Sequence, residues 1–286
     1  MNNPEKYLAS MWLQYRDAVE ILEEFDDKFK SMKGKIVDIG CGPGKVSKDL
    51  LLPKIGENAS VIGIDISPAM LKYAKVYCAN EERITFTQLN IETPDLPDNL
   101  IGQFDHATAF YCLNWCRNMK VTMENIYNLL KPGGRTIALL NLHHNIFDFY
   151  LEQQKDPSFS VYMKDALKYI PPHYGCGNPE KKFRAQLEGA GFNVLHCSAR
   201  SKVFTFQTMD HQLDFLWAVN PFLDRMPEDV KKRYRKDVEK RLRKKLQRIT
   251  NENSDGYVNI DDYYAILVAV FEKPQVERSV DSDAHI

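Results

Sequence analysis

The sequence lacks any long hydrophobic run. Across its 286 residues, no uninterrupted apolar stretch reaches the roughly 18 residues that a transmembrane helix needs. The beginning of the chain has no apolar segment of signal-peptide length, and it is interrupted by charged side chains such as Glu5, Arg16, Asp17 and Glu20. We therefore expect a soluble, cytoplasmic protein without stable membrane insertion.

Cysteines are few and are not arranged in pairs. The six are scattered along the chain as Cys41, Cys78, Cys112, Cys116, Cys176 and Cys197. Cys112 and Cys116 lack the second cysteine pair or the histidines that a zinc site requires. We expect reduced, buried thiols and no metal site.

The chain has almost no net charge, but its charges are unevenly distributed. The formal charge is −1, although segment 231–248 alone carries eleven Lys and Arg side chains against two acids. Apolar residues recur there at every fourth position, which predicts an amphipathic helix with one stripe packed on the body and a solvated basic face. Attraction to an anionic membrane or to RNA remains the alternative for this segment. The apolar positions are Val230, Tyr234, Val238, Leu242 and Leu246.

The most informative stretch is VDIGCGPGKVS at 37–47. The preceding run KIVDIG is typical of a buried parallel strand, and Gly40, Gly42 and Gly44 then allow a sharp turn and a close approach to a ligand. A second strand, SVIGID, ends at Asp65, as expected for a nucleotide site. The third glycine lies two residues after the second rather than three, which weakens the dinucleotide interpretation.

Strands and helices alternate along the first half of the chain. Five strand-to-helix alternations predict an α/β fold with a parallel sheet covered on both faces. After an irregular aromatic segment at 145–175, further helices are expected from Asn178 and in two stretches near 208–218 and 227–249. The expected strands are 35–39, 60–64, 83–91, a strand within 104–115, 135–142, 192–201 and 263–273.

The segment DIGCGPG at 38–44 resembles motif I of the class I methyltransferases, which use S-adenosylmethionine. Asp65, the pair Asn90 and Ile91, and the LLKPGG turn at 129–134 follow in the same order as in that family. The resemblance implies a Rossmann-like seven-stranded sheet with an antiparallel last strand and a helical cap. It also implies one methyltransferase domain over 1–273, in which residues 1–33 form the cap, 34–142 the cofactor half and 143–262 the substrate half, followed by a disordered tail over 274–286.

The same resemblance implies a cofactor role for particular residues. Asp65 would accept hydrogen bonds from the ribose hydroxyls, and the backbone at Gly40 and Gly42 would lie against the amino-acid part of the cofactor. Asp38 would face its ammonium group, Asn90 would bond the exocyclic amine of the adenine, and Ile91 would pack on the ring. The implied cofactor-binding set is Asp38, Gly40, Gly42, Gly44, Asp65, Ile66, Asn90, Ile91 and Phe110.

Four other stretches are similar to the insect juvenile hormone acid O-methyltransferases, namely residues 1–18, 104–115, 125–134 and 218–230. This resemblance implies methyl transfer to farnesoic acid, juvenile hormone acid or a related small-molecule carboxylic acid. The residues that hold the substrate carboxylate in that family match Gln14 and Trp115. Relatives commonly have histidine just before the tryptophan, whereas this chain has Asn114, which leaves the identity of the acid open.

Two other kinds of function compete with this interpretation. A nucleic-acid methyltransferase would be expected to carry an Asn-Pro-Pro-Tyr type motif after the fourth strand, but residues 109–115 read AFYCLNW. A binding module without catalysis would be expected to lose the glycines or Asp65, and all of them are present. We therefore expect an enzyme that does not bind nucleic acid.

Aromatic residues are candidates for the walls of a substrate tunnel, although ordinary core packing explains each of them singly. His143 and His144 fall near the expected site but have no companions that would complete a metal set. The tunnel candidates are Phe147, Phe149, Tyr150, Phe159, Tyr162, Tyr169, Trp217, Pro221 and Phe222.

Overall fold

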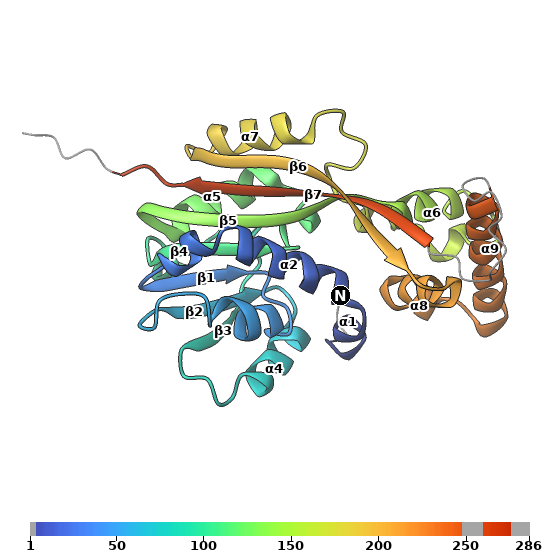
Figure 1. The fold of residues 1–286 in the computed structure, drawn as a ribbon, viewed down its shortest axis with the longest axis horizontal. Helices are drawn as coiled ribbons and strands as arrows, with labels where there is room; N and C mark the ends of the chain where they lie inside the picture. Colours follow the sequence, from blue (N-terminus) through green and yellow to red (C-terminus); the bar gives the residue numbers. More distant parts are fainter. Residues whose placement is uncertain (1–3, 248–259, 276–286) are drawn as a thin grey trace, which may run out of the picture.

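Seven strands form a single sheet in the order β3-β2-β1-β4-β5-β7-β6 (Figure 1). The structure is a computed structural model that describes residues 4–247 and 260–275. Strands β1 to β5 run parallel, whereas β7 pairs antiparallel with both β5 and β6. The predicted fold class is confirmed. The strands are β1 (Lys35–Ile39), β2 (Ser60–Asp65), β3 (Ile84–Gln88), β4 (Phe104–Phe110), β5 (Leu130–His144), β6 (Asn193–Phe206) and β7 (Ile260–Glu272).

Local sequence signals explain where several helices begin. Ser67 caps α4 by accepting a hydrogen bond from the Met70 amide, and Pro68 occupies the first turn. Asn178 caps α7 in the same way from its side-chain oxygen. The helices are α1 (Pro4–Ser10), α2 (Trp12–Glu24), α3 (Asp26–Lys30), a π-helical turn (Ser47–Leu51), α4 (Pro68–Tyr77), α5 (Met119–Leu129), α6 (Asn145–Gln153), α7 (Pro179–Gly189), α8 (Met209–Val219) and α9 (Glu228–Gln247).

Helices cover both faces of the sheet, and each face has its own hydrophobic core. One core joins the strands to α5 and α7 through residues such as Met123, Ile126 and Phe183. The other joins them to α2 and α3, with Leu22 and Phe29 among its buried residues. Because both faces are buried, the central strands are apolar along most of their length.

A third core lies beyond the sheet, where the ends of β6 and β7 extend to α6, α8 and α9 (Figure 1). The predicted stripe of α9 is buried in it through Val230, Tyr234, Val238 and Leu242, while the side chain of Leu246 lies outside the described part. Exposed basic residues of α9 form ion pairs one turn apart, such as Arg243 with Glu239, whereas Arg241 pairs both with Asp237 and with Glu152 of α6. These contacts support the solvated-face interpretation of the basic helix.

Several predicted boundaries differ from the structure. β6 ends at Phe206 rather than residue 201, and β7 spans Ile260–Glu272 rather than 263–273, because the two strands stay paired as far as Phe206 and Ile260. β3 ends at Gln88 rather than residue 91, because the Asn90 side chain accepts the Glu92 amide and turns the chain. β5 begins at Leu130 rather than residue 135, since Leu130 already pairs with Phe104 across a bulge. The aromatic segment after β5, predicted to be irregular, begins with helix α6, which is capped by the His144 imidazole.

No helix among the described residues is long and apolar enough to cross a membrane. All six cysteines are free, and four of them are buried. Most of the predicted tail, residues 276–286, lies outside the described residues.

Candidate functional site

A cavity of about 340 Å³ opens at the carboxyl ends of the parallel strands, beside the point where the strand order reverses between β1 and β4. Its lining comes from the glycine turn, from the ends of β2, β3 and β4, from helix α1 and from the 3₁₀ turn Ala166–Tyr169. The lining residues are Tyr7, Ile39, Gly40, Gly42, Ile64, Asp65, Ile66, Ser67, Met70, Leu89, Asn90, Ile91, Glu92, Phe110, Tyr111, Cys112, Trp115, Cys116, Lys168 and Tyr169.

Asp65 is held rigidly at the end of β2. One carboxylate oxygen accepts the Gly42 amide at 3.0 Å, and the other accepts the Ser67 amide at 2.8 Å. Both donors are backbone groups of neighbouring turns, so the carboxylate cannot rotate without losing them. Each oxygen keeps a further lone pair for a ligand hydroxyl in the cavity.

Two glycines of the turn line the cavity with backbone atoms alone. Gly40 and Gly42 have positive φ values of 73° and 54°, which favour glycine. A Cβ on Gly40 would collide with the Cys112 side chain at 2.4 Å, whereas one on Gly42 would meet only the Tyr7 ring at 3.9 Å. A side chain at Gly42 would therefore occupy the cavity itself. Gly44 lies outside the lining and packs close to Ala74 and Phe86.

The far end of the cavity is largely apolar. Ile91 and Phe110 are buried in its wall, while Ile66 is 62% exposed despite being apolar. Asn90 lies beside them, and its side-chain oxygen accepts the Glu92 amide at 3.0 Å. These apolar side chains give the cavity a surface on which a flat ring can pack.

Asp38 lies beneath the glycine turn and does not line this cavity. It is 3% exposed, and its two oxygens accept hydrogen bonds from the hydroxyls of Ser47 and Thr108. Burial raises the pKa of the Asp38 carboxyl, partly offset by those two hydrogen bonds. It borders a much smaller adjoining space together with Tyr7 and Gly40.

Trp115 lies in a short 3₁₀ turn after β4 and lines the cavity with its indole 38% exposed. Asn114 is buried behind it. With its amide oxygen turned toward the indole, Asn114 accepts a hydrogen bond from Trp115 Nε1 at 3.0 Å and donates one to the Tyr111 carbonyl at 3.2 Å. Asn114 therefore orients the indole and does not itself reach the cavity.

Gln14 is also absent from the cavity lining, like the predicted residues Asp38, Gly44 and Asn114. It lies on α2, half-buried, and its Oε1 atom is buried without a hydrogen-bond partner among the described residues. A buried acceptor without a partner is uncommon. Of the predicted pair, Trp115 lines the cavity, while Gln14 lies outside the lining with unused hydrogen-bonding capacity.

Several lining residues escaped the sequence interpretation. They include Tyr7 on α1 and Tyr111, which directly follows β4. The tyrosines carried no motif, because aromatic residues in this chain are mostly core. Cys112 and Cys116 are free thiols, as expected. Their place in the cavity lining was not predicted, because the sequence gives no indication of it beyond their location after β4.

The cavity offers no obvious general base. Among the described residues that line it, none is a histidine. Burial, followed by the charge of Asp65, raises the pKa of Tyr7 to about 12, and burial with Asp17 nearby raises the pKa of Tyr111. Glu92 already accepts two backbone amides, from Arg117 and Asn118. The site is therefore better suited to an acceptor that is already ionised.

Most of the proposed tunnel residues are core residues instead. Phe147, Phe149, Tyr150, Phe159 and Phe222 are buried in the third core, and of the tunnel candidates only Tyr169 lines the cavity among the described residues. His144 is likewise structural, with its Nδ1 accepting the Ile146 amide at 3.1 Å. His143 stacks on a neighbouring tyrosine ring.

Comparison with known proteins supplies independent information. Residues 37–136 match the family described as methyltransferase domain. A juvenile hormone acid O-methyltransferase of Drosophila melanogaster is 34% identical over 238 residues, covering 82% of this chain and 80% of the relative. The protein of the same name from Bombyx mori is 32% identical, covering 80% of this chain and 82% of the relative.

Solved structures are similar in fold at low identity. The YcgJ protein of Bacillus subtilis has a TM-score of 0.54 at 12% identity, covering 91% of this chain and all of that one. Phosphoethanolamine N-methyltransferase 2 of Haemonchus contortus, solved with S-adenosyl-L-methionine, has a TM-score of 0.53 at 17% identity, covering 96% of this chain and 58% of that one. At such identities the likeness shows the fold alone.

Proposed function

The chain belongs to the juvenile hormone acid O-methyltransferase family, and we propose that it methylates the carboxylate of farnesoic acid, juvenile hormone acid or a related isoprenoid or long-chain acid. It is an S-adenosylmethionine-dependent methyltransferase. The choice of acid is the proposal. The observation that carries it is the cavity that combines the Asp65 and glycine-turn cradle with Trp115 and lacks a general base.

The residues present fit the methyl donor. The open space before Gly42 and the fixed carboxylate of Asp65 suit the amino-acid part and the ribose, and the wall of Ile66, Ile91 and Phe110 suits the adenine. When bound, S-adenosylmethionine supplies a methyl group on a positively charged sulfur. Asp38 would act on the ammonium end from beneath the turn, through the space that it shares with Tyr7.

The acceptor needs orientation more than activation. A carboxylic acid has a pKa near 4 to 5, so it is an anion at neutral pH and needs no proton removed. The indole N–H of Trp115 and the amide of Gln14 are suited to hold one oxygen while the other points at the methyl group. Lys168 is the one lysine or arginine among the described lining residues, and it favours an anion in the cavity.

The clamp formed by Gln14 and Trp115 on the substrate carboxylate is affected by Asn114, which stands where relatives commonly have histidine. Its amide accepts the Trp115 N–H, so the indole must leave Asn114 or share its hydrogen with the substrate oxygen. A histidine at this position would change its hydrogen bonding with pH, whereas an amide does not. We infer that Asn114 gives the indole a fixed orientation, independent of pH near neutrality.

Turnover of a panel of acids tests the proposal. Purified protein with radiolabelled S-adenosylmethionine is expected to form methyl esters of farnesoic acid or juvenile hormone acid, and more slowly of saturated long-chain acids. Product is measured after organic extraction, with the matched alcohols as controls because they lack an ionised oxygen. Methylation of tRNA or protein with no turnover of any acid in the panel would contradict the proposal.

Two substitutions test the clamp. We expect Gln14→Ala and Trp115→Phe each to reduce kcat by about tenfold to a thousandfold, while the affinity for S-adenosylmethionine stays within about twofold. Trp115→Phe keeps an aromatic ring but removes the N–H donor together with part of the indole surface. If both variants work at the parental rate, the assignment of these two residues is wrong.

A further inference from the structure

A buried carboxylate joins the helix that carries Gln14 to the turn that carries Trp115. Asp17 lies three residues after Gln14 on α2 and is 0% exposed. Its Oδ1 atom accepts hydrogen bonds from Lys202 Nζ at 2.9 Å and from the Tyr264 hydroxyl at 2.8 Å, and its Oδ2 atom accepts the Tyr111 hydroxyl. The donors thus come from β6, from β7 and from the residue that follows β4.

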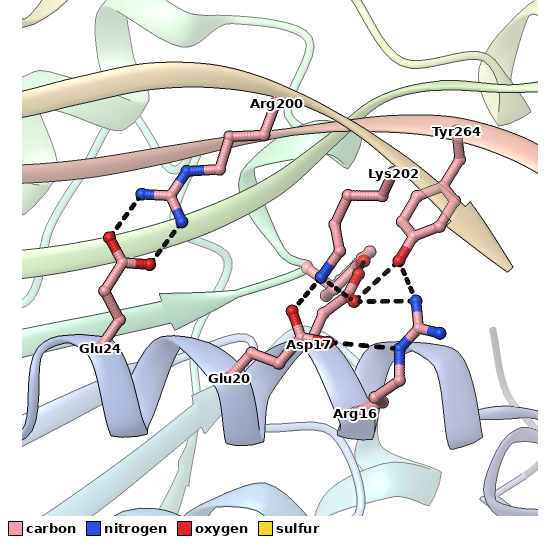
Figure 2. Close-up of polar contacts among 8 residues, drawn as sticks. Arg16, Asp17, Glu20, Glu24, Arg200, Lys202 and Tyr264 are labelled. Atoms are coloured by element: carbon pink, nitrogen blue, oxygen red, sulfur yellow. Dashed lines mark hydrogen bonds and ion pairs between the residues drawn. The ribbon is translucent and has the colours of Figure 1, made fainter.

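Charged groups around Asp17 form a balanced network (Figure 2). Arg16 and Lys202 both contact Asp17, and both also pair with Glu20, which lies further out on α2. Glu24 and Arg200 form a separate pair one turn along the helix. The lysine and arginine already satisfy the charge of Asp17, so charge alone does not explain the contact with Tyr111.

Tyr111 has an unusual backbone. Among the described residues it is the only one other than glycine with a positive φ, at 55°. Such a conformation is unfavourable for an aromatic residue and persists where the surroundings impose it. Two contacts hold it here, a hydrogen bond from its amide to the Leu139 carbonyl at 2.7 Å and the bond from its hydroxyl to Asp17.

Hydrogen bonds continue from Tyr111 to the indole. With the Asn114 amide in the orientation that satisfies both neighbours, the Tyr111 carbonyl accepts a hydrogen bond from the amide nitrogen at 3.2 Å and the amide oxygen accepts one from Trp115 Nε1 at 3.0 Å. Both Tyr111 and Trp115 line the cavity. A series of contacts therefore runs from the buried carboxylate of α2 to the indole N–H of Trp115, a residue that lines the cavity.

We propose that Asp17 and Tyr111 are positioning residues, which fix the Trp115 indole relative to Gln14 on α2 through the strained backbone of Tyr111 and the amide of Asn114. Neither touches the reacting atoms in this arrangement. Asp17 orients the Tyr111 side chain through its hydroxyl. Tyr111 in turn fixes the backbone after β4, and this backbone orients the Trp115 indole through Asn114. The expected change in kcat rests on the proposed function, whereas the expected change in the orientation of the Trp115 indole does not.

Two tyrosines of the network provide a matched pair of variants. Tyr111→Phe and Tyr264→Phe each remove one hydroxyl donor to Asp17, but only Tyr111 leads on to Trp115. With the acid that the parent uses best, Tyr111→Phe is expected to lower kcat by about tenfold to a hundredfold, with the KM for S-adenosylmethionine within twofold. Tyr264→Phe is expected to stay within twofold of the parent in both. Equal kcat for the two variants would overturn the proposal.

A second readout does not depend on substrate. The chain has three tryptophans, so its ¹⁵N spectrum contains three indole N–H signals, and the one that disappears in Trp115→Phe belongs to Trp115. Tyr111→Phe is expected to shift that signal and speed its exchange with solvent, whereas Tyr264→Phe leaves it in place. An unmoved signal in Tyr111→Phe overturns the inference even if the parent esterifies acids. A shifted signal supports it even if no acid in the panel is a substrate.

Discussion

Three aspartates are buried among the described residues, and two of them, Asp17 and Asp38, are held by different kinds of partner. Asp38 in β1 is held by the hydroxyls of Ser47 and Thr108, and burial raises its pKa. Asp17 in α2 is held by a lysine, an arginine and two phenols. Asp38 borders the small space under the glycine turn, where we propose that the ammonium group of the cofactor binds, while Asp17 joins α2 to β6, β7 and the residue after β4.

The difference is one of charge. Asp38 has only hydroxyl partners, whereas Asp17 is paired with two cations of the protein. Hydroxyl partners leave the charge of Asp38 available to an incoming cation, because they orient the carboxylate without neutralising it. Lys202 and Arg16 neutralise Asp17 within the fold, so that it serves as an anchor between α2, β6 and β7. Three sets of substitutions test this contrast.

The largest effect is expected from Asp17→Ala. Removing the carboxylate leaves two cations and two phenols without their common partner. We expect the free energy of unfolding to fall by about 3 kcal/mol. This is the lower end of the range for a broken buried pair, because the side chains of Lys202 and Arg16 are partly exposed. Urea unfolding at pH 7 measures the loss.

The control is Glu20→Ala, which removes an acid that contacts the same two cations but is about half exposed. It is expected to cost less than about 1 kcal/mol. If Asp17→Ala is as mild as this control, Asp17 is not an anchor.

A smaller, pH-dependent effect is expected from Asp38→Asn. The amide offers one acceptor oxygen to the two hydroxyls, so the variant should be less stable by about 1 kcal/mol at pH 4 without ligand. Because the folded pKa of Asp38 is raised, the parent loses stability relative to the variant as pH rises from the ordinary carboxyl value through the folded one. Unfolding free energies of both proteins at pH 4 to 8 should therefore converge or cross. A constant difference over this range would contradict the assigned burial of the charge.

The smallest effect is expected from Glu24→Gln. Glu24 and Arg200 form a two-bond pair, with one of the bonds at 2.7 Å, but both side chains are partly exposed. We expect a loss of about 0.5 kcal/mol that disappears in 1 M salt, measured by thermal unfolding at low and high ionic strength. A loss as large as that of Asp17→Ala would mean that any ion pair of the network, and not the buried carboxylate, carries its stability.

The features that were predictable from the sequence depend on local signals. The glycine turn, Asp65 at a strand end and the caps of α4 and α7 are each written within a few residues, and the alternation of strands and helices determined the parallel sheet. Helix α6 was missed because Phe147, Phe149 and Tyr150 are residues that favour strands or irregular segments over a helix.

The acceptor side depends on distant contacts, which explains why it was less predictable. The hydroxyl partner of Asp38 on β4 follows from the strand register, in which Asp38 lies opposite Thr108. The partners of Asp17 lie 94, 185 and 247 residues further on, in elements whose side-chain directions cannot be deduced from α2. One clue was present, since Asp17 falls four residues from both Leu13 and Ile21 on the apolar stripe of its helix.

The spacing of these partners also has a consequence during protein synthesis. Helix α2 is made early, but its buried carboxylate receives a lysine only when residue 202 has left the ribosome, and a phenol from β7 only after residue 264. Until then, docking α2 on the sheet would bury a charge that lacks its partners. We therefore expect α2 to dock fully on the sheet only after residue 264 has been translated.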